Sequence, residues 1–184
     1  MSPHANAVAT LAGWTAPSPS QAALAQAYLA LLSARPDACE RTCEPGHLTA
    51  SAVVLSHDLT SVAFVLHGIV GAWLAPGGHV EATDPTLADA ARREVREELG
   101  LEVDLDPDPV TLDCHPITCR GYDEPTRHLD VRFAARAHPG AELVRSDESR
   151  EVRWWPVDAL PDDVFDEVRE LVTAAVGRLA AGGE

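Results

Sequence analysis

The chain has 184 residues, of which 46% are hydrophobic and 23% are charged, which is typical of one folded domain and excludes a wholly disordered chain. Its formal net charge of −15 disfavours non-specific binding to nucleic acids or membranes, because both of those surfaces are anionic. Its longest apolar runs are far shorter than the about 20 residues that cross a bilayer, and the N-terminus lacks the pattern of a signal peptide, so we expect a cytoplasmic protein.

The first part of the chain predicts a single helix between irregular segments. Residues 1–17 are rich in Ala, Pro and Ser, and we expect them to be mobile. The segment Ser20–Leu32 consists mainly of strong helix formers, and Ser18 or Ser20 can cap its N-terminus. Pro36 ends this helix, because proline cannot continue the hydrogen-bond pattern.

The segments after residue 46 alternate between strand and helix signals. Strands are predicted at His47–Ser56, Ser61–His67, Gly71–Ala75, Val110–Thr118, His128–Ala137 and Glu151–Trp155. A last amphipathic helix is predicted at Asp163–Leu179. Because strands lie on both sides of one central helix, this order predicts an α/β domain with a mixed sheet. We therefore interpret 1–46 as a flexible N-terminus with an accessory helix, and 47–184 as the main domain.

The central helix has clear start and stop signals. It is predicted at Pro85–Leu99, with Asp84 at the N-cap, Pro85 at the first helical position and Gly100 just beyond the end. Leu87, Ala91 and Val95 form its apolar stripe. The residues Pro76-Gly77-Gly78 before it predict a turn.

Three carboxylates cluster on this helix. Glu94, Glu97 and Glu98 are three or four residues apart, so their side chains share one helix face. Such a cluster repels itself unless water or a hard cation lies among the carboxylates, and oxygen ligands suit Mg²⁺ or Mn²⁺. Arg93 or Arg96 can pair with one carboxylate and fix its rotamer. The alternative is a solvated helix face with ordinary Arg–Glu pairs.

The segment from Gly78 to Leu101 resembles the Nudix box, which reads Gly, five residues, Glu, seven residues, then Arg-Glu-aliphatic-any-Glu-Glu-any-Gly-aliphatic. Arg93–Leu101 matches the second half in full. The first half departs from the pattern, because Asp84 replaces the first Glu and eight residues separate it from Arg93. Asp84 either caps the helix or takes the family role of that acidic position.

The resemblance implies a Nudix-type fold, in which a mixed β-sheet is sandwiched between helices, here with an extra N-terminal helix. It also implies metal-dependent hydrolysis of a diphosphate linkage in a nucleoside diphosphate derivative, such as a nucleotide sugar, a dinucleotide or a nucleoside triphosphate. By position, the resemblance makes Glu94, Glu97, Glu98 and the Gly78 carbonyl ligands of Mg²⁺ or Mn²⁺, and Arg93 the residue that orients a carboxylate.

The sequence also allows two other functions. One alternative is a catalytically silent Nudix-fold domain that binds a nucleotide for regulation. Another is an isomerase-like relative, which would need a dedicated pair of a cysteine and an acid. The expected partner is a small nucleotide-like molecule, without stable nucleic-acid or membrane binding, and a homodimer is left open.

Three side chains outside the carboxylate cluster are candidates for substrate binding. His79 could contact a phosphate or be an ordinary loop histidine. Arg132 shares a strand face with His128 and Asp130, and this polar face could meet the substrate or be the wet face of an edge strand. Trp73 lies on the strand that enters the box and could wall a pocket.

Several further polar residues cannot be ranked from the sequence. The general base could be any of the loop acids Asp123, Glu124, Asp147 and Glu148, and His115, Arg120, Arg127 and Tyr122 lie in the same polar region. The cysteines Cys39, Cys43, Cys114 and Cys119 are expected to be reduced, partly buried thiols. A metal cluster or a disulfide is the alternative for them.

Overall fold

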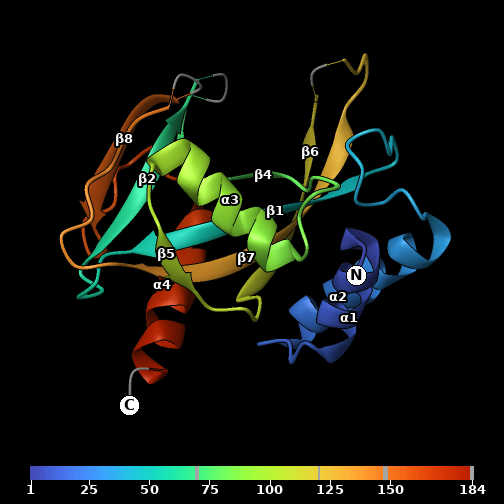
Figure 1. Cartoon of the computed structure of the whole chain (residues 1–184), viewed down its shortest axis with the longest axis horizontal. Coiled ribbons are helices and arrows are strands. Elements are labelled where there is room, and N and C mark those ends of the chain that lie inside the picture. Colours follow the sequence, from blue (N-terminus) through green and yellow to red (C-terminus); the bar gives the residue numbers. More distant parts are fainter. Residues whose placement is uncertain (69–70, 120, 147–148, 183–184) are drawn as a thin grey trace.

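The computed structural model describes residues 1–68, 71–119, 121–146 and 149–182. Within these ranges one mixed sheet runs in the order β3-β2-β1-β7-β5, while β4 pairs with β1, β6 with β7 and β8 with β2 (Figure 1). The strands are β1 (His47–Leu55), β2 (Ser61–His67), β3 (Trp73–Leu74), β4 (Gly77–His79), β5 (Val103–Leu105), β6 (Thr111–Ile117), β7 (Thr126–Ala137) and β8 (Ser149–Pro156). β1 and β7 pair in parallel, and the other pairs are antiparallel.

Helices cover both faces of this sheet. They are α1 (Pro3–Gly13), α2 (Pro19–Ala34), α3 (Leu87–Leu99) and α4 (Asp166–Ala181). In Figure 1, α3 crosses one face of the sheet and α4 lies on the other, while α1 and α2 lie together beside the end that carries β6. The α/β fold with a mixed sheet between helices is therefore confirmed.

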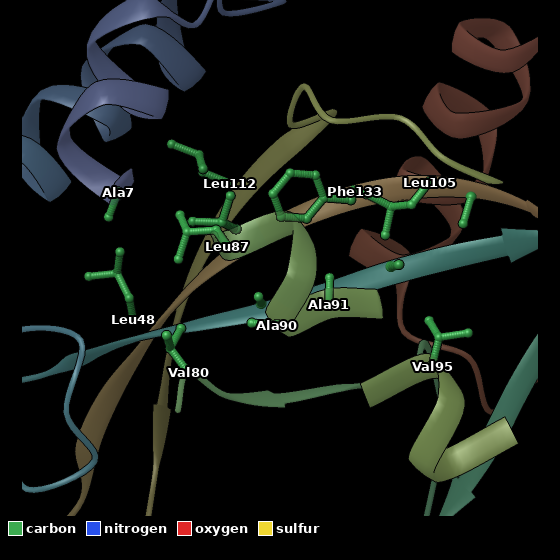
Figure 2. Packing of buried hydrophobic residues seen from close by; sticks show 14 of the residues in the cluster. Ala7, Leu48, Val80, Leu87, Ala90, Ala91, Val95, Leu105, Leu112 and Phe133 are labelled. Atoms are coloured by element: carbon green, nitrogen blue, oxygen red, sulfur yellow. The ribbon is translucent and has the colours of Figure 1, made fainter. Parts of the chain in front are cut away.

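The apolar stripe of α3 forms the centre of the larger core. Figure 2 shows Leu87, Ala90 and Val95 facing the sheet, with Phe133 of β7 among the side chains opposite them. These four side chains are completely buried. Each large apolar side chain buried in this way contributes about 1.5–3 kcal/mol, so the core holds α3 firmly against β1 and β7.

The N-terminal segment differs from its prediction. Residues 1–17 were expected to be mobile, but Pro3–Gly13 forms α1, capped by the Ser2 side chain. Tertiary contacts stabilise this short helix, since the Asn6 side chain accepts a hydrogen bond from the backbone N–H of Leu87 at 2.9 Å. A ring nitrogen of His4 also lies 2.9 Å from the Leu32 carbonyl oxygen. The expectation of a mobile segment was therefore wrong.

The sheet also corrects two strand predictions. The predicted Gly-Gly turn is the short strand β4, which pairs with β1 through the partners Ala50 and Gly78. β7 is an interior strand between β1 and the strands β5 and β6. The alternative that Asp130 and Arg132 lie on a wet edge strand is therefore wrong, and both residues are buried.

The N-terminal helices share the core of the sheet, which gives a first prediction. Leu32 of α2 is 1% exposed and belongs to the larger hydrophobic cluster. Leu32→Ala should lower the free energy of unfolding by about 2–5 kcal/mol, because it leaves a cavity in a packed core. Denaturant melts of this variant and of Gln26→Ala, an exposed position on the same helix, measure the difference. Equal stability of the two variants would show that α2 does not pack on the core.

Candidate active site on helix α3 and strand β4

The residues before α3 hold an arginine in place. The N-cap of α3 is Thr86, whose side chain accepts a hydrogen bond from the N–H of Asp89 at 3.0 Å. Asp84 is therefore not the N-cap that the sequence predicts. Its buried carboxylate receives hydrogen bonds from Arg93, from Nε at 3.1 Å and Nη2 at 3.0 Å. Asp84 thus positions Arg93 through a bidentate pair.

Arg93 in turn contacts two of the clustered carboxylates. Its Nη1 donates to Glu94 Oε1 at 2.8 Å and to Glu97 Oε2 at 3.0 Å. Its Nη2 also donates to the His79 carbonyl oxygen at 2.8 Å. Arg93 therefore links α3 to β4, and it fixes the direction in which Glu94 and Glu97 point.

The glycine pair of β4 lies directly against the other side of this cluster. The backbone N–H of Gly77 donates to Glu98 Oε2 at 3.1 Å. A Cβ atom on Gly78 would lie 2.5 Å from Glu94 Oε1 and 2.8 Å from Glu94 Oε2. A side chain at position 78 would therefore displace the Glu94 carboxylate, which occupies the space of a Cβ atom.

Burial and neighbouring charges raise the pKa of one carboxylate in this cluster. The pKa of Glu94 is raised, first by burial and then by the negative charges of Glu97 and Asp84, although Arg93 opposes the shift. The pKa of Arg93 is held above its usual range, mainly by its hydrogen bonds to Asp84. A carboxylate with a raised pKa is a frequent mark of a functional site.

A cavity of about 410 Å³ begins at the same glycines and extends under α4. Its polar floor consists of Thr49, Ser51, Asp130 and Arg132, from β1 and β7. Its apolar wall includes Leu74, Phe165, Val168 and Leu171. This size and this mixture of surfaces are typical of a site for a small ligand.

The cationic group in the cavity floor is already paired. Arg132 Nη2 lies 2.9 Å from Asp113 Oδ2, and Arg132 Nε donates to Asp130 Oδ2 at 3.1 Å. Ser51 also donates to that oxygen of Asp130, at 2.7 Å. A hydrogen bond from His115 to Asp113 raises the pKa of that imidazole. The floor is a connected polar network, and it carries little uncompensated positive charge.

Comparison with known proteins decides the family. The sequence profile of the NUDIX domain matches residues 47–175, which is more than two thirds of the chain. The chain belongs to the Nudix hydrolase family. The resemblance of the sequence to the Nudix box is thereby confirmed, as is the prediction of an enzyme of this class. No curated protein matches the sequence.

Solved structures share the Nudix fold at low sequence identity. A NUDIX-family hydrolase from Clostridium perfringens is 22% identical, with a TM-score of 0.56 over 72% of this chain and 97% of that one. An Ap4A hydrolase from C. elegans is 18% identical, with a TM-score of 0.58 over 73% and 98%. Dihydroneopterin triphosphate pyrophosphohydrolase from E. coli is 19% identical, with a TM-score of 0.58 over 71% and 95%.

The predicted substrate-binding residues of this Nudix hydrolase fall in three different places. Arg132 lines the cavity. Trp73 is 6% exposed and packs in the core, with its ring centroid 5.4 Å from that of Trp155, so the prediction that it walls the pocket is corrected. His79 lies beyond the cavity, beside the sulfur of Cys119 and the ring of His128.

Only two of the four candidates for a general base lie within the described residues. Asp123 and Glu124 are exposed loop residues, and neither lines the cavity. Asp147 and Glu148 lie outside the described residues, as does Arg120.

No helix of the described residues is long and apolar enough to cross a membrane.

The sequence did not predict the groups that surround His79. His47 at the start of β1 and Cys119 after β6 lie close to it, although 72 residues separate His47 from Cys119. Neither residue belongs to a recognisable ligand motif. The one available signal was a histidine at the start of an otherwise apolar strand, which is uninformative without knowledge of its neighbours.

Proposed function

We propose that this Nudix hydrolase cleaves a diphosphate linkage in a nucleoside diphosphate derivative, and that it uses Mg²⁺ or Mn²⁺. The observation that carries the proposal is the convergence of three carboxylates on β4. Glu94 fills the space above Gly78, and Glu98 accepts the N–H of Gly77. Arg93, which also contacts Glu94, donates a hydrogen bond to the carboxylate of Glu97.

The donor set fits a hard divalent cation. Glu94, Glu97, Glu98 and the Gly78 carbonyl offer oxygen atoms, which Mg²⁺ and Mn²⁺ prefer. The absence of a side chain at Gly78 brings its backbone close to Glu94. When bound there, the ion would lower the pKa of a water molecule and offset the charge of the phosphoryl group.

The chain's own residues orient this site. Asp84 holds Arg93, and Arg93 holds Glu94 and Glu97, so the carboxylates keep their direction before substrate arrives. Such preorganisation lowers the barrier, because little rearrangement is then needed during the reaction. With a net charge of −15, the protein needs this local arrangement to accept an anionic substrate.

The cavity under α4 supplies room for the part of the substrate beyond the phosphates. It meets the carboxylate site at the glycine pair of β4, and Leu74, Phe165 and Val168 give it an apolar side. The charge of Arg132 is compensated by Asp113 and Asp130. An uncharged ring with polar edges therefore suits the cavity better than a further phosphate.

We further propose that residues 1–46 are an accessory to a Nudix domain formed by 47–184. α2 contributes Tyr28 and Leu32 to the core. The hydroxyl of Tyr28 also donates to the carbonyl oxygens of Asp113 and Asp130. The accessory helices would therefore support the strands β6 and β7 that carry the cavity floor.

The direct test is phosphate release from a panel of nucleotide sugars, dinucleotides and nucleoside triphosphates, with Mg²⁺, with Mn²⁺ and with EDTA. The proposal expects turnover of at least one compound that depends on the metal. Activity unaffected by EDTA would contradict the metal assignment. Nucleotide binding without any turnover would instead support the second candidate, a silent regulatory domain, although the complete set of box carboxylates disfavours it.

A further inference from the structure

The structure gathers three imidazoles and one thiol at the ends of separate strands. His47 begins β1, His79 ends β4, and His128 lies near the start of β7. Cys119 lies in the segment after β6. Their four ligand atoms lie within 4.8 Å of one another. We propose that these four residues bind a Zn²⁺ ion, at a site distinct from the carboxylates of the Nudix box and independent of the function proposed above.

The distances suit tetrahedral zinc. Cys119 Sγ lies 3.6 Å from His47 Nε2, 3.6 Å from His79 Nε2 and 3.2 Å from His128 Nε2. With ordinary Zn–S and Zn–N bond lengths, a tetrahedral ion separates sulfur and nitrogen ligands by about 3.5 Å. Small rotations of the side chains therefore suffice to seat the ion.

The backbone prepares His47 for this role. Its Nδ1 lies 3.2 Å from the carbonyl oxygen of Cys43, so Nδ1 carries the proton and donates to that oxygen. The lone pair of Nε2 then points toward Cys119. Metal-binding histidines commonly donate their second ring nitrogen to a backbone carbonyl in this way, which fixes the tautomer and the ring orientation.

Hydrogen bonding alone accounts poorly for the cluster. A thiol has one proton, yet three ring nitrogens surround the sulfur of Cys119. The rings of His47, His79 and His128 lie with centroids 5.0–5.1 Å apart, and His47 is completely buried. A cation that accepts four lone pairs satisfies all of these groups together.

The ligand set also selects the metal and its role. Imidazole and thiolate favour Zn²⁺ over Mg²⁺ or Ca²⁺, which prefer oxygen. Since the protein supplies all four ligands, the coordination shell is closed, as in structural zinc sites. The ion would tie the segment of Cys119 to the sheet. The hydroxyls of Tyr122 and Thr126 already bind that region to the segment between α2 and β1, by donating to the carbonyl oxygens of Arg41 at 2.5 Å and Glu44 at 2.6 Å.

The test uses the full chain, first stripped of metal and then titrated with Co²⁺, which reports a thiolate ligand by its charge-transfer absorption. We expect the charge-transfer band to saturate at about one Co²⁺ per chain and to disappear when Zn²⁺ displaces the Co²⁺. Cys119→Ser should lose the charge-transfer band, and His47→Asn should weaken Co²⁺ binding at least about tenfold. Cys114→Ser removes an exposed thiol outside the cluster and should behave as the wild type.

Two further measurements separate this site from the Nudix box and from a folding defect. Glu98→Gln should keep the Co²⁺ band, which distinguishes failure of the zinc proposal from failure of the hydrolase proposal. Zinc should raise the melting temperature of the stripped wild type by about 5 °C or more, but not that of Cys119→Ser. A wild type without the band, or a band that persists in Cys119→Ser, overturns the proposal.

Discussion

Glu98→Gln is expected to reduce turnover about 10²-fold or more, the scale of removing one strong electrostatic contributor from an active site. The amide oxygen can still accept the hydrogen bond that the N–H of Gly77 donates to Glu98 at 3.1 Å. The substitution therefore removes a negative charge while it keeps the contact between α3 and β4. The rate of phosphate release at saturating metal measures the loss.

Glu102→Gln is the matched control for this experiment. Glu102 lies just after α3 and forms an exposed pair with Arg96, with 2.5 Å between Nε and Oε1. It makes the same chemical change near the same helix but away from β4, so turnover should stay close to that of the wild type. If the turnover of Glu98→Gln lies within a few-fold of this control, Glu98 is not a catalytic residue.

Gly78→Ala should also cost about 10²-fold in turnover, although it adds only one methyl group. The new Cβ would lie 2.5 Å from Glu94 Oε1 and 2.7 Å from its Cδ. Glu94 would have to move away, and a displacement of about 1 Å at a reacting centre can have this effect. Because the clash involves the end of a side chain, the melting temperature should change little. Turnover at the wild-type rate would show that Glu94 is not needed where it lies.

Gly77→Ala provides the contrast on the neighbouring residue. Its Cβ would lie 2.8 Å from the Cα atom of Ser51 and 3.0 Å from the carbonyl oxygen of Ala50. The backbone of a central strand cannot yield as a side chain does, so this variant should lose about 1–3 kcal/mol of stability. Denaturant melts of both glycine variants test the difference. A larger loss in Gly78→Ala would contradict the assigned contacts.

The sequence predicts those parts of the fold in which local pattern and tertiary structure agree. The strand Ser61–His67 has the predicted bounds. Gly100 ends α3 in the left-handed conformation, with φ of 68°. In both places the residues that form the element also carry its signal. The spacing of three residues on a helix face likewise brings Glu94 and Glu97 together, where Arg93 contacts both.

Elements that depend on distant partners were missed. β4 consists of two glycines and a histidine, residues with weak strand preference, and it is a strand because β1 pairs with it. Asp84 has the sequence context of an N-cap, but its carboxylate forms an ion pair with Arg93 instead, and Thr86 caps the helix. The His and Cys cluster arises only because the parallel pairing of β1 and β7 makes His47 and His128 neighbours.

Mn²⁺ binding tests most directly whether the carboxylates on α3 hold the divalent ion of this Nudix hydrolase. Electron paramagnetic resonance counts free Mn²⁺ during a titration of the full-length protein. We expect Glu94→Gln and Glu98→Gln to weaken binding at least about tenfold, because even the loss of an outer partner of a metal ligand has that effect. Glu102→Gln should bind as the wild type does. Equal Mn²⁺ affinity in all four proteins would mean that the ion binds elsewhere, and would contradict the account.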